Sequence, residues 1–305
     1  MVFCAAIKLK GVLMKKLPVS LALAALFVAP LAMAKTVDVV ASFTVLADIV
    51  KQVGGDHVRV KSLVGPDGDP HTFEPTPQDS QALAKADLVF VSGLGLEGWM
   101  DRLVSASGYR GQPVVASTGI TTRSMEEEGK TITDPHAWNS MQNGVIYATN
   151  VMNALVKADP DDAAQIRQRG ENYIQQLQAL DRWAKTAFDR VPAERRKVLT
   201  SHDAFGYFGQ RYGITFLAPV GFSTEAEASA SEVGSLITQL KQQHIQRYFI
   251  ENQTDPRLVK QIASATGAQP GGELYPEALS PAAGPAPTYE AAFRHNVNAM
   301  LKSMQ

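Results

Sequence analysis

Residues 159–192, DPDDAAQIRQRGENYIQQLQALDRWAKTAFDRVP, form the longest helical pattern in the sequence. Pro160 and the acidic residues beside it suit the start of a helix, and Pro192 marks its end. On both sides of this stretch, short apolar runs alternate with amphipathic ones, as they do in βαβ units with parallel strands. The sequence therefore predicts an α/β protein in which one long α-helix joins two similar lobes.

Each lobe is expected to hold a mostly parallel β-sheet flanked by helices. We assign residues 35–158 to the N-terminal lobe, 159–192 to the linking helix and 193–305 to the C-terminal lobe. The polar stretch 125–133 is interpreted as a loop, and so is GGELYPEALS, residues 271–280, after the penultimate helix. Because loops at the carboxyl ends of parallel strands gather between such lobes, the cleft is the default ligand site.

The first 34 residues have the pattern of an export signal. The charged start MKK at 14–16 precedes an apolar run, which ends in the A-x-A cleavage site AMA at 32–34. We therefore predict a cleavable signal peptide over residues 1–34, with Met14 as its start and Lys35 as the first mature residue. No Leu-x-x-Cys stands at the cleavage site, so we expect a soluble periplasmic protein without a lipid anchor.

Charge and cysteine content narrow the partners and ligands. The full chain has 29 Lys and Arg against 30 Asp and Glu, a net charge of −1. Removing residues 1–34 takes away four lysines and no acidic residue, which leaves a mature charge of about −5. A mildly acidic chain has no electrostatic basis for binding nucleic acid. The only cysteine, Cys4, is lost with the signal, so neither a disulfide nor a thiolate ligand is expected. We also expect the protein to be a monomer.

The tripeptide Asp-Pro-His occurs twice, at 69–71 and at 134–136, in a chain with six histidines. Each copy lies in a loop that follows a strand-like segment. Proline keeps the preceding aspartate out of helical geometry, so each copy is a stiff corner that fixes the direction of an imidazole. His71 and His136 could therefore belong to a turn used twice, to a catalytic pair or to two arms of one metal site.

Two further residues complete a candidate set of four ligands. His202 ends the strand-like run KVLTSH in the second lobe, and Glu277 lies in the loop GGELYPEALS. Three imidazoles and one carboxylate form an N/O site that suits a borderline divalent metal such as zinc. The remaining histidines are not expected to bind metal; His57 is interpreted as an exposed residue at the start of a strand, and the others are His244 and His295.

Five segments of the chain resemble hallmark segments of the metal-binding solute-binding proteins of zinc- and manganese-type ABC importers. Their order is the same, and the resemblance covers nearly the whole mature chain. This family has two lobes and a rigid linking helix. The segments are DPHTFEPTPQD (69–79), DPHAW (134–138), SHDAFGYFGQRYG (201–213), STEAEASASEV (223–233) and LYPEALSPAAGPAPTYEAAFRHNV (274–297).

The resemblance implies that His71, His136, His202 and Glu277 are the metal ligands and that the protein delivers its metal to a membrane permease rather than acting as an enzyme. A periplasmic metallochaperone is a further candidate partner. The chain departs from the family pattern in two places. The fourth ligand is commonly Asp, whereas Glu277 has an extra methylene group, and Ala228 replaces a frequent proline.

The ligand set favours Zn²⁺ as the cargo, with Mn²⁺ as the alternative. Manganese prefers harder oxygen donors, and manganese-type members of the family tend to have Glu where this chain has His202. The long His-rich loop of many zinc-type members is absent, which argues the other way. Two other functions stay open: a secreted zinc hydrolase with three histidine ligands and a water, in which Glu277 would be the general base, and an adhesin.

Overall fold

The computed structural model describes residues 1–2, 36–127, 129–221, 224 and 228–305. The predicted signal peptide, apart from its first two residues, lies outside the described residues. One compact unit extends from Ala34 to Gln305. Within the described part of the chain, no helix combines the length and the apolar character needed to cross a membrane.

The N-terminal lobe contains a four-stranded parallel sheet whose strands run in the order β2-β1-β3-β4. Its strands are β1 (Val37–Ala41), β2 (Val58–Ser62), β3 (Leu88–Val91) and β4 (Val114–Val115). Its helices are α1 (Thr44–Gly54), η1 (Gly55–His57), α2 (Pro77–Lys85), α3 (Met100–Ser107), η2 (Ala137–Asn139) and α4 (Met141–Ala158). The parallel sheet and its flanking helices confirm the predicted α/β class.

The C-terminal lobe repeats this plan with the strand order β10-β9-β7-β8, again all parallel. Its strands are β7 (Lys197–Leu199), β8 (Thr215–Leu217), β9 (Arg247–Glu251) and β10 (Gln269–Leu274). Its helices are η3 (Ala193–Arg195), α6 (Gly206–Tyr212), α7 (Ala230–Gln242), α8 (Arg257–Thr266) and α9 (Tyr289–Ser303).

The interpretation of residues 271–280 as a loop is wrong at its start, because the first residues of this stretch belong to strand β10. Pro270 lacks an amide hydrogen, and the pairing with β9 shifts by one residue between Pro270 and Gly272. Proline and a bulge are tolerated on an edge strand, and β10 lies at the edge of its sheet. The apolar alternation of a strand is absent from this sequence, so its pattern gave no sign of pairing. Glu277 does lie in the loop that follows.

The interpretation of residues 125–133 as a polar loop is also wrong. Ser124–Glu127 and Lys130–Thr133 form an antiparallel hairpin, β5 and β6. Only one face of it is buried, through Met125, and Gly129 in the turn has a φ of 72°, which glycine adopts without strain. With so few apolar residues, the alternation typical of a strand is too faint to read from the sequence.

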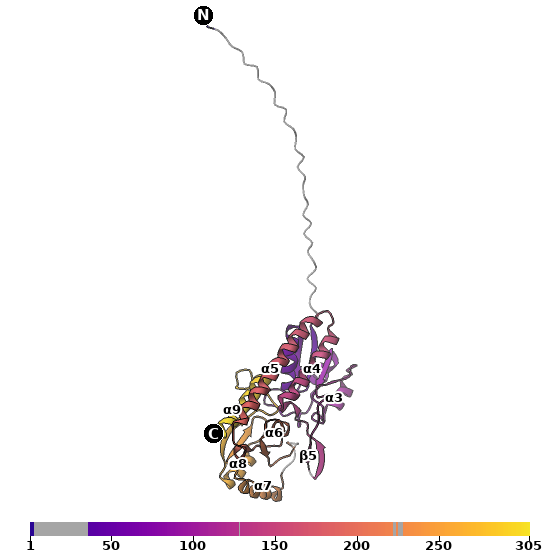
Figure 1. Ribbon diagram of the computed structural model, residues 1–305. Coiled ribbons are helices and arrows are strands. Elements are labelled where there is room, and N and C mark those ends of the chain that lie inside the picture. The colour runs from indigo at the N-terminus through magenta and orange to yellow at the C-terminus, as the bar shows by residue number, and fades with distance from the viewer. Residues whose placement is uncertain (3–35, 128, 222–223, 225–227) are drawn as a thin grey trace. The chain divides into compact units, whose positions relative to one another are not determined.

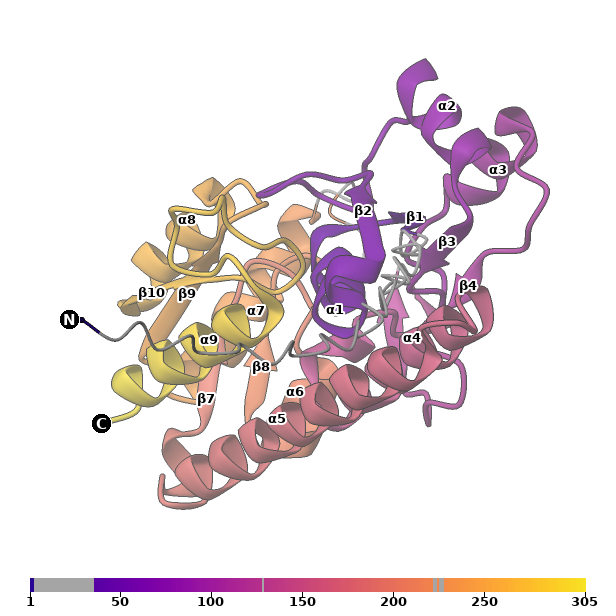
Figure 2. The same ribbon diagram turned by 90° about the horizontal axis from the view of Figure 1, so that it is seen from above.

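The linking helix α5 spans Ala163–Asp189 and is shorter at each end than the predicted stretch. Its buried residues recur every three or four positions and form one stripe along the whole helix, which packs against α1, α4, α6 and α9. Figures 1 and 2 show α5 running alongside elements of both lobes. Gly170 lets α4 approach closely, because a Cβ there would lie 2.5 Å from the Met152 sulfur.

The two lobes share one hydrophobic core, which runs from β1 through the face of α5 to β7, β9 and α9. Hydrogen bonds also tie the end of the chain back to α1: the Leu279 amide donates to Thr44 at 2.9 Å, and the Tyr289 amide donates to Asp48 at 2.8 Å. A second, smaller apolar cluster lies between α7, α8 and their strands. Because a continuous core opposes hinge bending, we expect only small movements of one lobe against the other.

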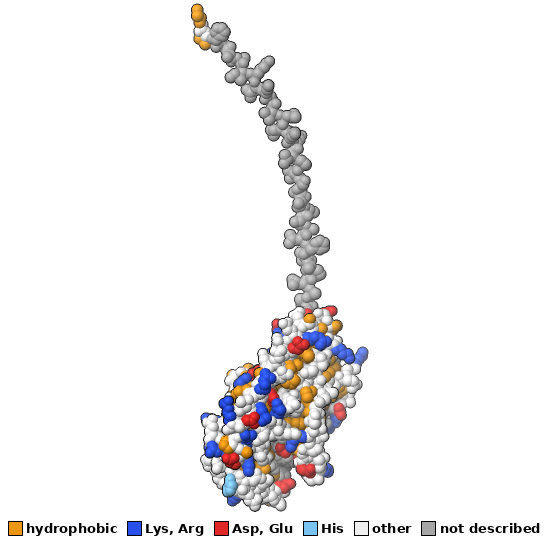
Figure 3. All heavy atoms as spheres, in the orientation of Figure 1, with side chains coloured by type: hydrophobic (Ala, Val, Ile, Leu, Met, Phe, Trp, Pro, Cys, Tyr) orange, Lys and Arg blue, Asp and Glu red, His pale blue; other side chains and the backbone are white. Residues whose placement is uncertain are grey.

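The surface drawn in Figure 3 carries basic and acidic side chains interspersed with neutral ones over the folded body. This face therefore has no extended patch of one sign.

Candidate metal centre

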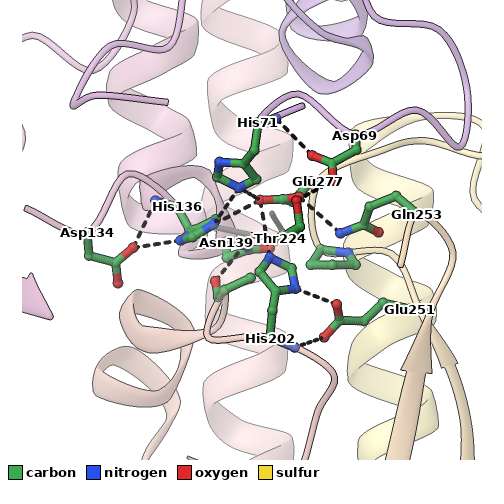
Figure 4. A network of polar contacts seen from close by, with 12 residues as sticks. Asp69, His71, Asp134, His136, Asn139, His202, Thr224, Glu251, Gln253 and Glu277 are labelled. Atoms are coloured by element: carbon green, nitrogen blue, oxygen red, sulfur yellow. Dashed lines mark hydrogen bonds and ion pairs between the residues drawn. The ribbon is translucent and has the colours of Figure 1, made fainter. Parts of the chain in front are cut away.

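The structure brings the four candidate ligands together between the lobes (Figure 4). The Oε1 atom of Glu277 lies 2.7 Å from Nε2 of His71, 2.8 Å from Nε2 of His136 and 3.4 Å from Nε2 of His202. The Nε2 atoms of His71 and His136 are 3.3 Å apart. Four donor atoms that converge in this way have the spacing of ligands around a single small cation.

The two Asp-Pro-His corners form the same local turn. In each, the aspartate Oδ1 accepts a hydrogen bond from the histidine backbone amide two residues later, at 2.8 Å for His71 and 2.9 Å for His136. An aspartate that bonds its own backbone in this way closes an Asx-turn. The prediction of two stiff corners is confirmed, and the turn presents both imidazoles to the same point.

The two aspartates then differ in what else they hold. Asp134 lies directly beside His136, and its Oδ1 accepts a second hydrogen bond from Nδ1 at 2.8 Å. Its other oxygen accepts from Arg123. Asp69 instead accepts from the Thr224 hydroxyl of the C-terminal lobe at 2.5 Å. Asp134 therefore fixes the tautomer that leaves Nε2 of His136 facing the centre, whereas Asp69 joins the two lobes.

Glu251 orients the imidazole of His202, as Asp134 orients the imidazole of His136. It is the last residue of β9, is buried, and accepts from His202 Nδ1 at 2.5 Å and from the amides of Ser201 and His202 at 3.0 and 3.2 Å. This residue was missed from the sequence. Its one signal was an acidic side chain at the carboxyl end of a buried parallel strand, where ligand sites gather.

Two tryptophans position the ligand loops through the residues before the ligands. Trp99 donates from its indole to the carbonyl of Pro70 at 2.8 Å, and Trp138 donates to that of Pro276 at 2.7 Å. These prolines directly precede His71 and Glu277 in the chain. Each loop is thus held by a buried aromatic side chain from the N-terminal lobe, and Trp138 does so across the cleft.

Glu277 is fully buried, and its second oxygen accepts from Gln253 Nε2 at 3.0 Å. Burial by itself would raise the pKa of this carboxyl. The neighbouring His71 and His202 outweigh burial and hold the pKa of Glu277 well below its usual range. A carboxylate ionised among imidazoles offsets one of the two positive charges of a divalent cation.

Two of the imidazoles hold protons strongly when no metal is present. Burial lowers the pKa of His136, but its bonds to Asp134 and Glu277 outweigh that effect and raise the pKa to about 9. The pKa of His202 also lies well above its ordinary value, because the charges of Glu251 and Glu277 outweigh burial. Below pH 9, protons therefore compete with a metal for the His136 imidazole.

We expect the affinity for Zn²⁺ to fall steadily as the pH is lowered from 9 to 6. Ligation requires neutral imidazole, and His136 is protonated in the empty site below its pKa of about 9. Each displaced proton should weaken binding by about tenfold per pH unit. Competition titrations against a zinc chelator at each pH would give the slope, and calorimetry in buffers of different ionisation enthalpy would give the number of protons released. A pH-independent affinity with no proton release would contradict this electrostatic picture.

A cavity of about 620 Å³ adjoins the centre and is lined by His202, Asp69 and Gln253 among others. The four candidate ligands are themselves almost completely enclosed, with 3% or less of each side chain exposed. The cavity is therefore the open side from which a small cation could reach His202.

The family comparison matches residues 39–303 to ZnuA, described as zinc-uptake complex component A, periplasmic. The manganese-binding lipoprotein MntA of Bacillus subtilis is 31% identical over 88% of this chain and 90% of its own length. The iron-binding protein YfeA of Yersinia pestis is 33% identical over 88% of this chain and 86% of its own.

Solved structures give the same result. The periplasmic zinc-binding protein TroA of Treponema pallidum superimposes with a TM-score of 0.83 at 31% identity, covering 88% of this chain and 99% of that one. The names of these similar proteins specify manganese, iron and zinc, so relatives with this fold differ in their metal.

One expectation is in conflict with these names. The prediction that the protein has no lipid anchor relied on the missing Leu-x-x-Cys before Lys35, yet MntA and the streptococcal relative SsaB are named lipoproteins. We therefore withdraw that prediction. The match of almost the whole folded chain carries the broader conclusion: the chain belongs to the ZnuA family and is a metal-binding solute-binding protein of the kind that serves ABC importers.

Proposed function

We propose that the protein captures Zn²⁺ between its lobes and delivers it to the membrane permease of an ABC importer. The observation that carries this proposal is the convergence of three imidazole nitrogens on one carboxylate oxygen of Glu277. We propose His71, His136, His202 and Glu277 as the four ligands. The lobes are taken as residues 35–158 and 193–305, linked by 159–192.

The donor set supports zinc over manganese. Three neutral nitrogens and one oxygen make a softer site than manganese prefers, and the tight cluster suits the four-coordinate geometry of zinc. Manganese stays the alternative cargo, because MntA is named a manganese-binding protein and is similar over most of the chain.

The position of Glu277 counts against a zinc hydrolase. A general base has to stand beside a metal-bound water, outside the ligand shell. Glu277 Oε1 instead lies within 3.4 Å of all three imidazole nitrogens, in the place of a fourth ligand. A protein that surrounds its metal on four sides leaves no position for an activated water.

Release of the metal must follow from local changes, because the continuous core and α5 restrict hinge bending. Two of the contacts that join the lobes beside the centre run from Thr224 to Asp69 and from Trp138 to the carbonyl before Glu277. We propose that docking on the permease shifts these loops, separates Glu277 from the histidines and frees the cation. A metallochaperone could load the same site through the cavity beside His202.

The physiological cargo is tested by elemental analysis of protein purified from its native compartment without added metal. We expect zinc at about one atom per chain and manganese well below that level, because zinc binds N/O sites more tightly than manganese does. Growth of a deletion strain under zinc limitation, rescued by the intact gene, is the matching measurement. Manganese in the purified protein, with rescue only under manganese limitation, would overturn the assignment of zinc and leave metal capture intact.

A further inference from the structure

A second group of potential ligands lies where α4 turns into α5. It consists of His57, the last residue of η1, with Asp159 and Asp162 from the turn. One donor atom from each lies within 4.8 Å of the other two. We propose that these three side chains bind a second divalent transition-metal cation and that this ion fastens the start of the linking helix to the N-terminal lobe.

Asp159 provides the first observation. The residue is 2% exposed, yet its Oδ2 has no hydrogen-bond partner among the residues that the structure describes. Its Oδ1 accepts from the amide of Asp162 over a long distance, 3.4 Å. A buried carboxylate oxygen without a partner is costly, and a bound cation removes that cost.

The contact between His57 and Asp162 provides the second observation. Nδ1 of His57 lies 3.2 Å from Oδ2 of Asp162, but the two atoms are not aligned as a hydrogen bond, and this buried nitrogen has no other partner in the described chain. Two donor atoms at this separation that do not point at each other are placed as neighbouring ligands of one ion are. The expectation that His57 is exposed is wrong, since only 13% of its side chain is accessible.

Asp162 provides the third observation, because its side chain does not cap the helix that it precedes. It precedes the first residue of α5, where an aspartate commonly caps the helix, yet its side chain makes no capping bond. Its Oδ1 accepts from Gln165 at 3.2 Å, and its Oδ2 faces His57. The side chain is thus directed across the turn to η1 rather than onto its own helix.

One imidazole and two carboxylates are donors that Zn²⁺ and Mn²⁺ accept, and water would complete the coordination at a partly exposed site. With one protein ligand fewer than the centre between the lobes, this site should bind more weakly. It would exchange zinc with the medium while the first site retains its cargo. Its effect is structural, because it links η1 to the first turn of α5.

The test uses the mature protein with Zn²⁺ alone as the probe. In wild-type protein, equilibrium dialysis should find a second, weaker zinc ion per chain after the first site is filled. In a His71→Ala/His202→Ala background, which removes the first site, zinc should still bind and should still raise the melting temperature. Adding Asp159→Asn, which keeps the shape of the side chain, should abolish both effects, and His57→Gln should act in the same way. Asp161→Asn, an exposed neighbour in the same turn, is the matched control and should change neither.

The two sites can fail separately. If wild-type protein binds a single zinc ion and the double-alanine variant binds none, the second site does not exist and the first is unaffected. Binding of the second ion that survives both Asp159→Asn and His57→Gln would place it elsewhere and overturn this proposal. Loss of only the second ion in Asp159→Asn protein with a native circular dichroism spectrum would support it.

Discussion

Replacing His202 by alanine is expected to lower the affinity for Zn²⁺ on the order of 10²–10³-fold. Four-ligand zinc sites bind with about 10–16 kcal/mol, so each ligand contributes about 3 kcal/mol. His202 is the only histidine ligand from the C-terminal lobe among the four, and its Nε2 has no hydrogen-bond partner within the described chain. Without it, the cation would keep two imidazoles and Glu277 on an incomplete shell.

Competition titration against a zinc chelator measures this loss, since direct calorimetry cannot reach very tight binding. His244→Asn is the control, because His244 is exposed and takes no part in the cluster. A milder companion is Glu251→Gln, which keeps the imidazole but weakens its orienting partner and should cost about 10–100-fold. Unchanged affinity in the His202→Ala protein would remove His202 from the site.

Replacing Glu277 by glutamine is expected to weaken zinc binding on the order of 10²–10³-fold as well, for a different reason. The amide keeps the shape of the side chain but removes the one negative charge that touches all three imidazoles. A divalent cation would then be buried among neutral donors, which raises its desolvation cost. The same charge sustains the raised pKa values of His136 and His202, so the pH at which zinc binding is lost should also fall.

Glu277→Asp is the informative partner of this variant. It keeps the charge and shortens the side chain by one methylene group, which restores the residue common in the family pattern. The carboxylate should then lie too far from the histidines in this backbone, and we expect about a tenfold loss, between wild type and the glutamine variant. If the glutamine variant binds zinc as tightly as wild type, Glu277 is not a ligand, and the hydrolase alternative regains its basis.

The elements that could be predicted are those whose cause is local. The long amphipathic stripe of α5 and the strand–helix alternation follow from short-range periodicity, so both lobes and the linking helix could be predicted from the sequence. Strand β10 and the hairpin of β5 and β6 were not, because proline, glycine and charge conceal their pairing. Strand β10 forms by pairing with β9, and β5 and β6 form by pairing with each other.

The sequence by itself determined the two Asp-Pro-His corners, because proline and an Asx-turn act within three residues. It could not assign the different tasks of Asp69 and Asp134, although the tripeptides are identical. One reaches a threonine 155 residues away, and the other turns back onto its own histidine. Nor could it find Glu251, which lies 49 residues from His202. Such contacts depend on how the strands of a sheet and the two lobes pack, and only the folded chain brings those groups within hydrogen-bonding distance.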